Sequence, residues 1–135
     1  MNLVVDTNIL ILFFRQNPVY NIISNSKSLN LKLFIPQYAI DELERNINDI
    51  INYSKKREEE IKELIIKLKQ HLIIIEAEKF KSFEDKVKKL APHEKDIPFF
   101  ALALYLNAYI WSNELAFKDQ SEIKILRTRD LIEII

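Results

Sequence analysis

The chain contains no glycine and no cysteine among its 135 residues. Dinucleotide-binding and P-loop turns need glycine where the backbone approaches phosphate, so nucleotide sites of those two kinds are excluded. The lack of cysteine excludes a disulfide framework, a cysteine-ligated zinc site and an iron–sulfur cluster, and it favours an intracellular protein. His71 and His93 are the only histidines. They are too few for a histidine-rich metal centre, and no catalytic partner is spaced to pair with either.

Neither sign of charge is in excess, since 20 Lys and Arg balance 20 Asp and Glu. Contact with nucleic acid must therefore depend on the local placement of charge rather than on a generally basic surface. Residues 55–95 carry 12 Lys and Arg against 9 Asp and Glu, which suits either solvated helices or a surface for a phosphate backbone. No signal peptide is visible and no apolar run reaches the roughly 20 residues that cross a bilayer, so we expect a cytoplasmic protein with no membrane contact.

Short apolar runs alternate along the chain with helical patterns. The runs lie at residues 3–5, 31–35, 72–75, 108–111 and 123–126, and each stops at a polar residue or proline, as strands buried on both faces do. Between them the apolar residues follow helical spacing, for example Ile61, Leu64, Ile65 and Leu68. We expect Tyr105, Tyr109 and Trp111 to belong to the core. The pattern predicts one α/β domain, residues 1–135, with a largely parallel sheet.

Three of four notable acidic residues lie where an α/β sheet collects functional groups, at strand ends or at the start of a buried helix. Asp6 and Glu114 come just after apolar runs, and Asp96 precedes the apolar helix expected over residues 97–106. Glu42 borders the inward stripe of a helix that begins at Pro36. The carboxyl ends of parallel strands meet at one edge of the sheet. If these carboxylates converge there, they form a hard-oxygen site suited to Mg²⁺ or Mn²⁺.

Helix capping explains two of these acids equally well. Asp6 is placed to cap the helix expected from Ile9, with Thr7 or Asn8 sharing that role. Asp96 stands at the start of a buried helix, where the helix dipole and free N–H groups stabilise an anion. A metal site and a set of helix caps both remain consistent with these positions.

Taken together, four sequence blocks resemble the PIN domain ribonucleases, which include the VapC-type toxins. The blocks are Val4-Val5-Asp6-Thr7-Asn8, Glu42-Leu43, Asp96-Ile97-Pro98-Phe99-Phe100-Ala101-Leu102-Ala103-Leu104 and Ile110-Trp111-Ser112-Asn113-Glu114, the last followed by Phe117. They span nearly the whole chain in the order and spacing of the family. The resemblance implies a three-layer α/β/α sandwich and a metal-dependent ribonuclease, active as the toxin of a toxin–antitoxin pair. It also implies RNA as substrate, an antitoxin protein as partner and a homodimer.

The resemblance also implies roles for individual residues. Asp6, Asp96 and Glu114 would hold Mg²⁺ or Mn²⁺, and Glu42 would orient or deprotonate a water molecule. Side chains that would hydrogen-bond or support the carboxylates are Thr7, Asn8, Ser112 and Asn113. The residues that would contact RNA are Lys95, Arg127 and Arg129, for which ordinary surface charge is the alternative.

The last block departs from the family pattern at two positions. Glu114 replaces the usual aspartate, and Ala116 replaces a second acid; Asp119 lies nearby but outside the pattern. These changes leave open a second hypothesis, a catalytically impaired PIN-like module that binds RNA or protein. Two other acid-bearing α/β folds fit less well. A haloacid-dehalogenase-like phosphatase needs an acid at Asn8 and a nearby glycine, and a receiver domain needs a lysine where Arg127-Thr128-Arg129 stands.

Overall fold

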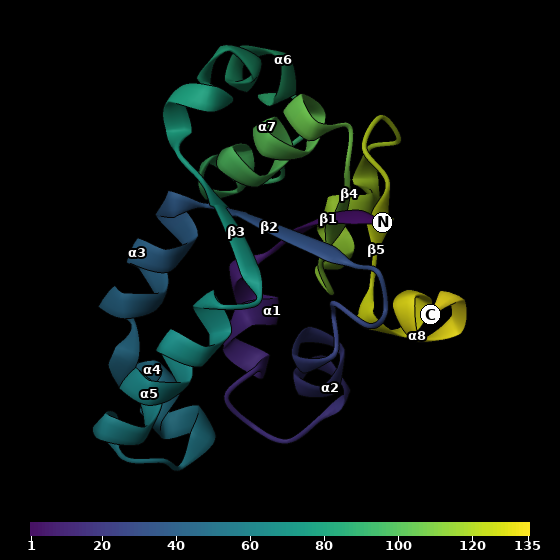
Figure 1. Ribbon diagram of the computed structural model, residues 1–135. Coiled ribbons are helices and arrows are strands. Elements are labelled where there is room, and N and C mark those ends of the chain that lie inside the picture. The colour runs from purple at the N-terminus through teal and green to yellow at the C-terminus, as the bar shows by residue number, and fades with distance from the viewer.

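The computed structural model describes residues 1–135 and contains a five-stranded, fully parallel sheet of order β3-β2-β1-β4-β5 (Figure 1). The strands are β1 (Asn2–Val5), β2 (Lys32–Pro36), β3 (Leu72–Ile75), β4 (Tyr109–Trp111) and β5 (Ile125–Leu126). The five expected strands are therefore confirmed, with β4 and β5 shorter than the apolar runs that predicted them. The first strand lies at the centre of the sheet, so the residue that follows it is surrounded by neighbouring strands.

Helices cover both faces of the sheet, which confirms the α/β/α sandwich (Figure 1). The α-helices are α1 (Thr7–Leu12), α2 (Pro18–Ser24), α3 (Gln37–Arg45), α4 (Ile47–Ser54), α5 (Glu58–Lys69), α6 (Glu84–Val87), α7 (Ile97–Leu106) and α8 (Thr128–Ile134), and the 3₁₀ turns are η1 (Ala77–Lys79), η2 (Lys81–Phe83), η3 (Glu94–Asp96) and η4 (Leu115–Asp119). From the central strand β1, the chain adds β2 and then β3 on one side of the sheet, and afterwards adds β4 and then β5 on the other side of β1. Right-handed crossovers therefore place α1 to α5 on one side and α6 and α7 on the other.

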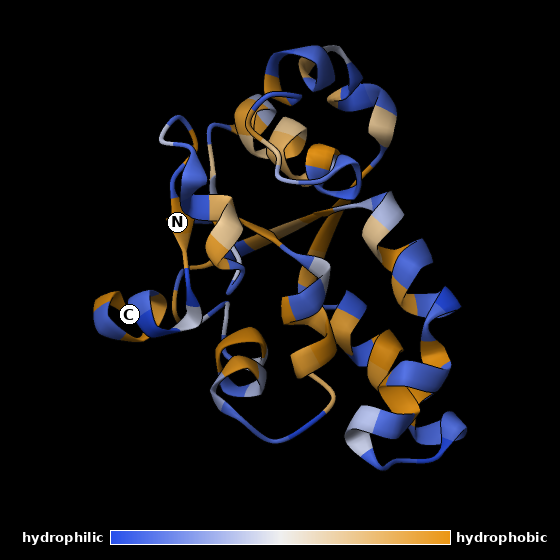
Figure 2. Ribbon diagram, turned by 180° about the vertical axis from the view of Figure 1, so that it is seen from behind, coloured by the Kyte–Doolittle hydropathy of each residue, from blue (hydrophilic) through white to orange (hydrophobic).

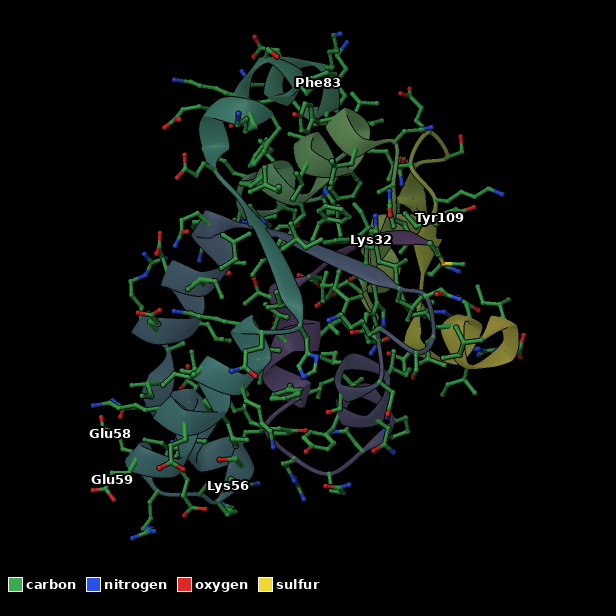
Figure 3. All side chains as sticks on the ribbon, viewed as in Figure 1. Lys32, Lys56, Glu58, Glu59, Phe83 and Tyr109 are labelled. Carbon is green, nitrogen blue, oxygen red and sulfur yellow. The ribbon has the colours of Figure 1, made fainter.

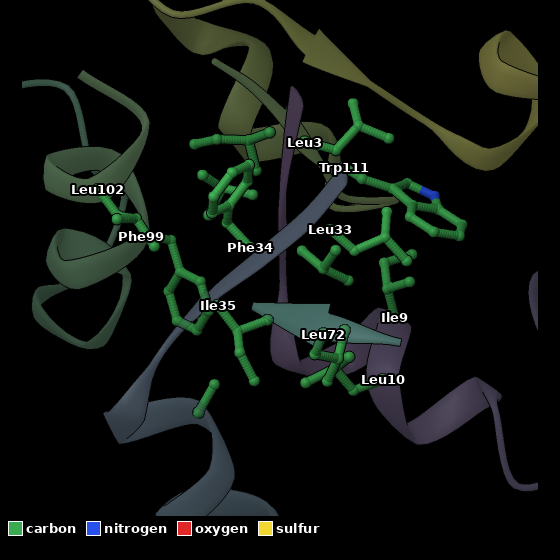
Figure 4. Packing of buried hydrophobic residues seen from close by; sticks show 14 of the residues in the cluster. Leu3, Ile9, Leu10, Leu33, Phe34, Ile35, Leu72, Phe99, Leu102 and Trp111 are labelled. Atoms are coloured by element: carbon green, nitrogen blue, oxygen red, sulfur yellow. The ribbon is translucent and has the colours of Figure 1, made fainter. Parts of the chain in front are cut away.

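The core is one cluster of 35 buried apolar residues. Leu33 and Phe34 are neighbours in β2 and point to opposite sides of the strand, with Phe34 on the side of α7 (Figure 4). Hydrophobic colouring accordingly runs along the strands and through α1 in Figure 2. Helix α7 is apolar on nearly all sides because the sheet covers one side and α6 and η2 pack on another, which confirms the expectation of a buried helix.

Some expectations about burial were wrong. Trp111 is completely buried, but Tyr105 and Tyr109 are 40% and 36% exposed. Tyr105 lies near the end of α7 and Tyr109 begins β4, so both lie at the edge of the layers, where less of the structure covers them. The charged segment 55–95 contains one long helix, α5, followed by β3, the short helix α6 and three 3₁₀ turns. None of the helices has both the length and the apolar character needed to cross a membrane.

Candidate active site

The register of the sheet brings the ends of β1 and β4 together. Val5 of β1 pairs with Trp111 of β4, and the backbone N–H of Asp6 donates to the carbonyl of Trp111 at 3.1 Å. The next residues along the two strands, Asp6 and Ser112, are therefore neighbours. The Ser112 hydroxyl donates to Oδ2 of Asp6 at 2.9 Å. Asp6 is only 5% exposed and Ser112 is fully buried, so the carboxylate is held in a fixed place.

Three of the four predicted acids line one cavity of about 310 Å³, here called the acidic cavity. Asp6 comes from the end of β1, Glu42 from α3, and Asp96 from the start of α7. The remaining lining residues are Thr7, Asn8, Ile11, Asn46, His93, Lys95 and Phe99. These elements meet because β1 and β2 end at the same edge of the sheet, and the N-terminus of α7 approaches that edge from the opposite layer. The fold thus brings together carboxylates that are 90 residues apart in the sequence.

Glu114 lies beside this cavity and is exposed, and it does not belong to the lining. Its Oε1 accepts a hydrogen bond from Nδ2 of Asn8 at 3.2 Å, and its backbone N–H donates to the Ser112 hydroxyl at 3.1 Å. Ser112 therefore links the backbone of Glu114 to the carboxylate of Asp6. Glu114 is close enough for its charge to raise the pKa values of both Asp6 and Asp96.

The acids at this site perturb one another. Burial raises the pKa of Asp6 to about 6; the charges of Asp96 and Glu114 add to that shift, and the Ser112 hydroxyl and the backbone N–H of Asn8 partly oppose it. Burial also raises the pKa of Asp96, and the charges of Glu114 and Glu42 contribute. None of the four acids forms an ion pair with a lysine or arginine. The acids outnumber the one lysine, Lys95, that lines the cavity with them.

Helix capping accounts only in part for Asp6 and Asp96, although the backbone N–H of Asn8 stabilises the Asp6 carboxylate. Asp6 precedes α1 and Asp96 precedes α7, but neither carboxylate makes a capping hydrogen bond of ordinary geometry. Asp6 instead accepts from Ser112, which lies 106 residues away in the sequence. A buried carboxylate without an ion-pair partner costs free energy, and such a cost is common at functional sites.

The supporting residues named from the sequence have different surroundings. The Thr7 hydroxyl is buried and makes no hydrogen bond, so it orients no carboxylate in this arrangement. Asn8 contacts Glu114, as described above. The side-chain oxygen of Asn113 accepts from the backbone N–H of Thr128 at 2.9 Å and thereby joins the end of β4 to the start of α8. Asn113 therefore positions α8 rather than a carboxylate.

The three basic residues expected to contact RNA are also separated. Lys95 is exposed and lines the acidic cavity. Arg127 is partly buried, and its Nε lies 3.7 Å from Oδ2 of Asp130 in the first turn of α8. Arg129 is exposed on the same helix. The structure thus brings Lys95 to the acids and does not bring Arg127 or Arg129 into the cavity lining.

Sequence reasoning missed three polar residues of the site. Asn46 lines the cavity four residues after Glu42, one helical turn further along α3. His93 also lines it, with its Nδ1 accepting from the backbone N–H of Lys95 at 3.1 Å. The Tyr38 hydroxyl donates to Oε2 of Glu42 at 3.4 Å, and burial and the charge of Glu42 raise the pKa of Tyr38. Tyr38 and Asn46 each lie four residues from Glu42, and this helical spacing could have identified them from the sequence. No pattern in the sequence connected His93 with the acids.

The donor set suits a hard divalent cation. Carboxylates rather than sulfur or imidazole dominate the site, their mutual repulsion is uncompensated, and the buried Thr7 oxygen lacks a partner. As the side chains lie, no group of three or more histidine, cysteine or acidic residues is arranged to hold a metal ion. The chemistry of the residues nevertheless fits Mg²⁺ or Mn²⁺.

A parallel α/β/α sandwich with unpaired acids at the carboxyl end of its central strand is the arrangement expected for a PIN domain. Comparison with known families supports this class: the PIN domain family matches residues 4–130. The chain belongs to the PIN domain family. No curated protein sequence matches the chain.

Solved structures of similar fold cover nearly the whole chain. VapBC2 from Rickettsia felis, bound to a DNA fragment from its promoter, has a TM-score of 0.66 at 22% identity over 94% of this chain and 98% of that one. PAE2754 from Pyrobaculum aerophilum has a TM-score of 0.72 at 11% identity over 99% and 88%. VapBC-1 from nontypeable Haemophilus influenzae has a TM-score of 0.66 at 18% identity over 96% and 99%. At these identities the likeness concerns the fold.

Proposed function

We propose that this protein is a metal-dependent endoribonuclease that hydrolyses RNA phosphodiester bonds and acts as the toxin of a toxin–antitoxin pair. The main support is the acidic cavity itself, whose lining contains buried Asp6 together with Glu42 and Asp96, none of which forms an ion pair with a lysine or arginine. The family membership and the similarity of fold to two VapBC structures support the toxin assignment. On the same grounds, the partners proposed are RNA, an antitoxin protein and a second copy of the chain.

In this proposal each acidic side chain has a defined task. Asp6, Asp96 and Glu114 would hold Mg²⁺ or Mn²⁺, which when bound acidifies water and neutralises the charge on the scissile phosphate. Ser112 fixes the orientation of Asp6 through the 2.9 Å hydrogen bond. Glu42, oriented by the Tyr38 hydroxyl, accepts a proton from the attacking water.

The hydrolysis balances as an addition of water across one P–O bond. The water oxygen forms a bond to phosphorus, the bond from phosphorus to the 3′ oxygen breaks, and that oxygen takes up a proton. The products carry a 5′-phosphate and a 3′-hydroxyl. Lys95 is the one cationic side chain in the lining, and it is placed to attract the phosphate that the acids repel.

The test is cleavage of end-labelled RNA by the purified protein with Mn²⁺, with Mg²⁺ or with EDTA. We expect cleavage with either metal and none with EDTA. Asp6→Asn and Asp96→Asn should each reduce the rate about 100-fold or more, since each removes a carboxylate that would hold the catalytic metal ion. A matched control is Asp41→Asn, because Asp41 is exposed, adjacent to Glu42 in α3, and outside the cavity lining.

Each outcome separates the hypotheses. Loss of cleavage in Asp6→Asn and Asp96→Asn with full activity in Asp41→Asn supports the proposal. Cleavage that survives both cavity substitutions would come from a contaminant and would contradict it. RNA binding without cleavage under any metal condition would instead identify a catalytically impaired module, to which the exposed position of Glu114 and the presence of Ala116 would then be relevant.

A further inference from the structure

A second polar cavity lies at the opposite edge of the sheet from the acids. It has a volume of about 570 Å³ and is lined by Ser24, Ser26, Lys27, Leu31, Lys32, Leu33, Gln70, His71, Leu72 and Ile73. We call it the basic cavity. It opens at the amino ends of β2 and β3, beside the ends of α2 and α5. Figure 3 labels Lys32 at the start of β2. The basic cavity reaches Leu33, and about 10 Å of strand lies between that residue and the end of β2 on the side of the acids.

The basic cavity has cationic groups and no acid in its lining. Lys27, Lys32 and His71 contribute nitrogen atoms, and the chain has no acidic residue in either segment that builds the cavity, 7–40 and 64–75. Burial lowers the pKa of His71, and the charges of Lys67 and Lys27 lower it further, which places both lysines close to the imidazole. The C-termini of α2 and α5 lie beside the cavity, and each carries a partial negative charge of about half a unit. Together these charges are smaller than the summed positive charge of Lys27, Lys32 and Lys67.

None of the polar side chains in this lining has a partner within the chain. The side chains of Ser24, Ser26, Lys27, Lys32, Gln70 and His71 make no hydrogen bond, and Lys27 and Lys32 make no ion pair. The remaining four lining residues are apolar. A lining that combines unpartnered donors with apolar residues has the composition of a binding site for an anionic ligand, and the volume lies within the roughly 300–1,000 Å³ usual for small-molecule sites.

We propose that the basic cavity binds a phosphate group carried by a nucleotide or by a nucleic-acid strand. Phosphate oxygens accept strong hydrogen bonds from ammonium and hydroxyl groups, and both kinds of donor line the cavity. The four apolar residues provide a surface for the rest of the ligand. This site is independent of the acidic cavity, because binding of phosphate here needs neither a divalent ion nor cleavage.

The two histidines of the chain allow a direct test by NMR. His71 lines the basic cavity and His93 lines the acidic one, so each imidazole reports on one site. With EDTA present, inorganic phosphate should move the His71 resonances saturably and raise the His71 pKa, and it should leave the His93 resonances unchanged. The acids around His93 repel the anion when no divalent cation is present.

Substitutions then assign the binding to named side chains. Lys27→Gln and Lys32→Gln should each weaken phosphate binding about fivefold to tenfold, the loss of one charge-assisted hydrogen bond. The matched control is Lys81→Gln, which removes the same charge from an exposed position on η2 in the other helix layer. Absence of a saturable shift at His71, or equal weakening in Lys81→Gln, would overturn the proposal, because the second result indicates unspecific attraction.

Two further titrations show whether the phosphate group that binds belongs to a single nucleotide or to a nucleic-acid strand. If a nucleoside monophosphate and a short RNA bind with equal affinity, the site accommodates one nucleotide. If the RNA binds more tightly and loses that advantage in Lys27→Gln, the site holds part of a strand. Either result supports a phosphate site. If Lys27→Gln and Lys32→Gln bind both ligands as tightly as wild type does, the proposal is contradicted.

Discussion

Replacing the buried Asp6 by asparagine should make the protein more stable at neutral pH. Asp6 is 5% exposed and its pKa is raised from 3.8 to about 6, so ionising it in the folded state costs free energy. One pKa unit corresponds to about 1.36 kcal/mol, so a shift of roughly two units costs about 3 kcal/mol above pH 6. The substituted asparagine side chain would carry no charge at any pH.

The direction of the pH dependence follows from proton binding. Between pH 4 and pH 6 the folded state keeps the proton on Asp6, and the unfolded state has already lost it. Stability from this group is therefore complete below pH 4, falls as the pH rises through 6, and then stays constant. Acidic residues with lowered pKa values behave in the opposite way.

The neutral substitution has its own cost. The asparagine amide would be buried, and a donor without a partner costs about 1–3 kcal/mol. That cost does not change with pH, so it cancels when the two proteins are compared across the pH range. The stability difference between Asp6→Asn and wild type should therefore move in favour of the variant by about 3 kcal/mol between pH 4 and pH 7.

Urea denaturation of both proteins in EDTA, at intervals from pH 4 to pH 8, measures this difference. The slope of unfolding free energy against urea should be similar in the two proteins, which shows that the midpoint difference reflects stability. If the stability difference does not change between pH 4 and pH 7, or changes in favour of wild type, ionisation of Asp6 does not destabilise the folded state as we infer.

Three further predictions concern the same region. Millimolar Mn²⁺ or Mg²⁺ should raise the melting temperature of wild type and not of Asp6→Asn, since a ligand at 100 times its dissociation constant stabilises the folded state by about 2.7 kcal/mol; equal shifts in both would show binding elsewhere. Ser112→Ala removes the donor to Asp6 and the acceptor for the N–H of Glu114, so it should raise the Asp6 pKa above 6 and cost about 1–3 kcal/mol, measured by NMR titration and urea denaturation. Trp111→Phe deletes the indole N–H that donates to the Thr128 hydroxyl at 3.0 Å and should cost about 1–3 kcal/mol without abolishing metal-induced stabilisation; loss of that stabilisation would mean that α8 also shapes the acidic cavity.

The sequence alone determined the sheet and its layers. Residues 3–5 are apolar without interruption because β1 is buried on both faces, and the helical spacing of Ile61, Ile65 and Leu68 arises because α5 buries one side. Both patterns are properties of local segments. Three of the four acids could also be named in advance, because Asp6 directly follows β1, Glu114 lies three residues after the end of β4, and Asp96 precedes the most apolar helix.

Only the tertiary structure decided how the acids are held. The pairing of Val5 with Trp111 brings Asp6 to Ser112, and burial at that point raises the Asp6 pKa; neither could be deduced from residues 106 positions apart. The same holds for His93, which lines the acidic cavity, and for Lys27 and His71, which both line the basic cavity although they are 44 residues apart. Distances across layers depend on how whole elements pack, and sequence periodicity describes only one element at a time.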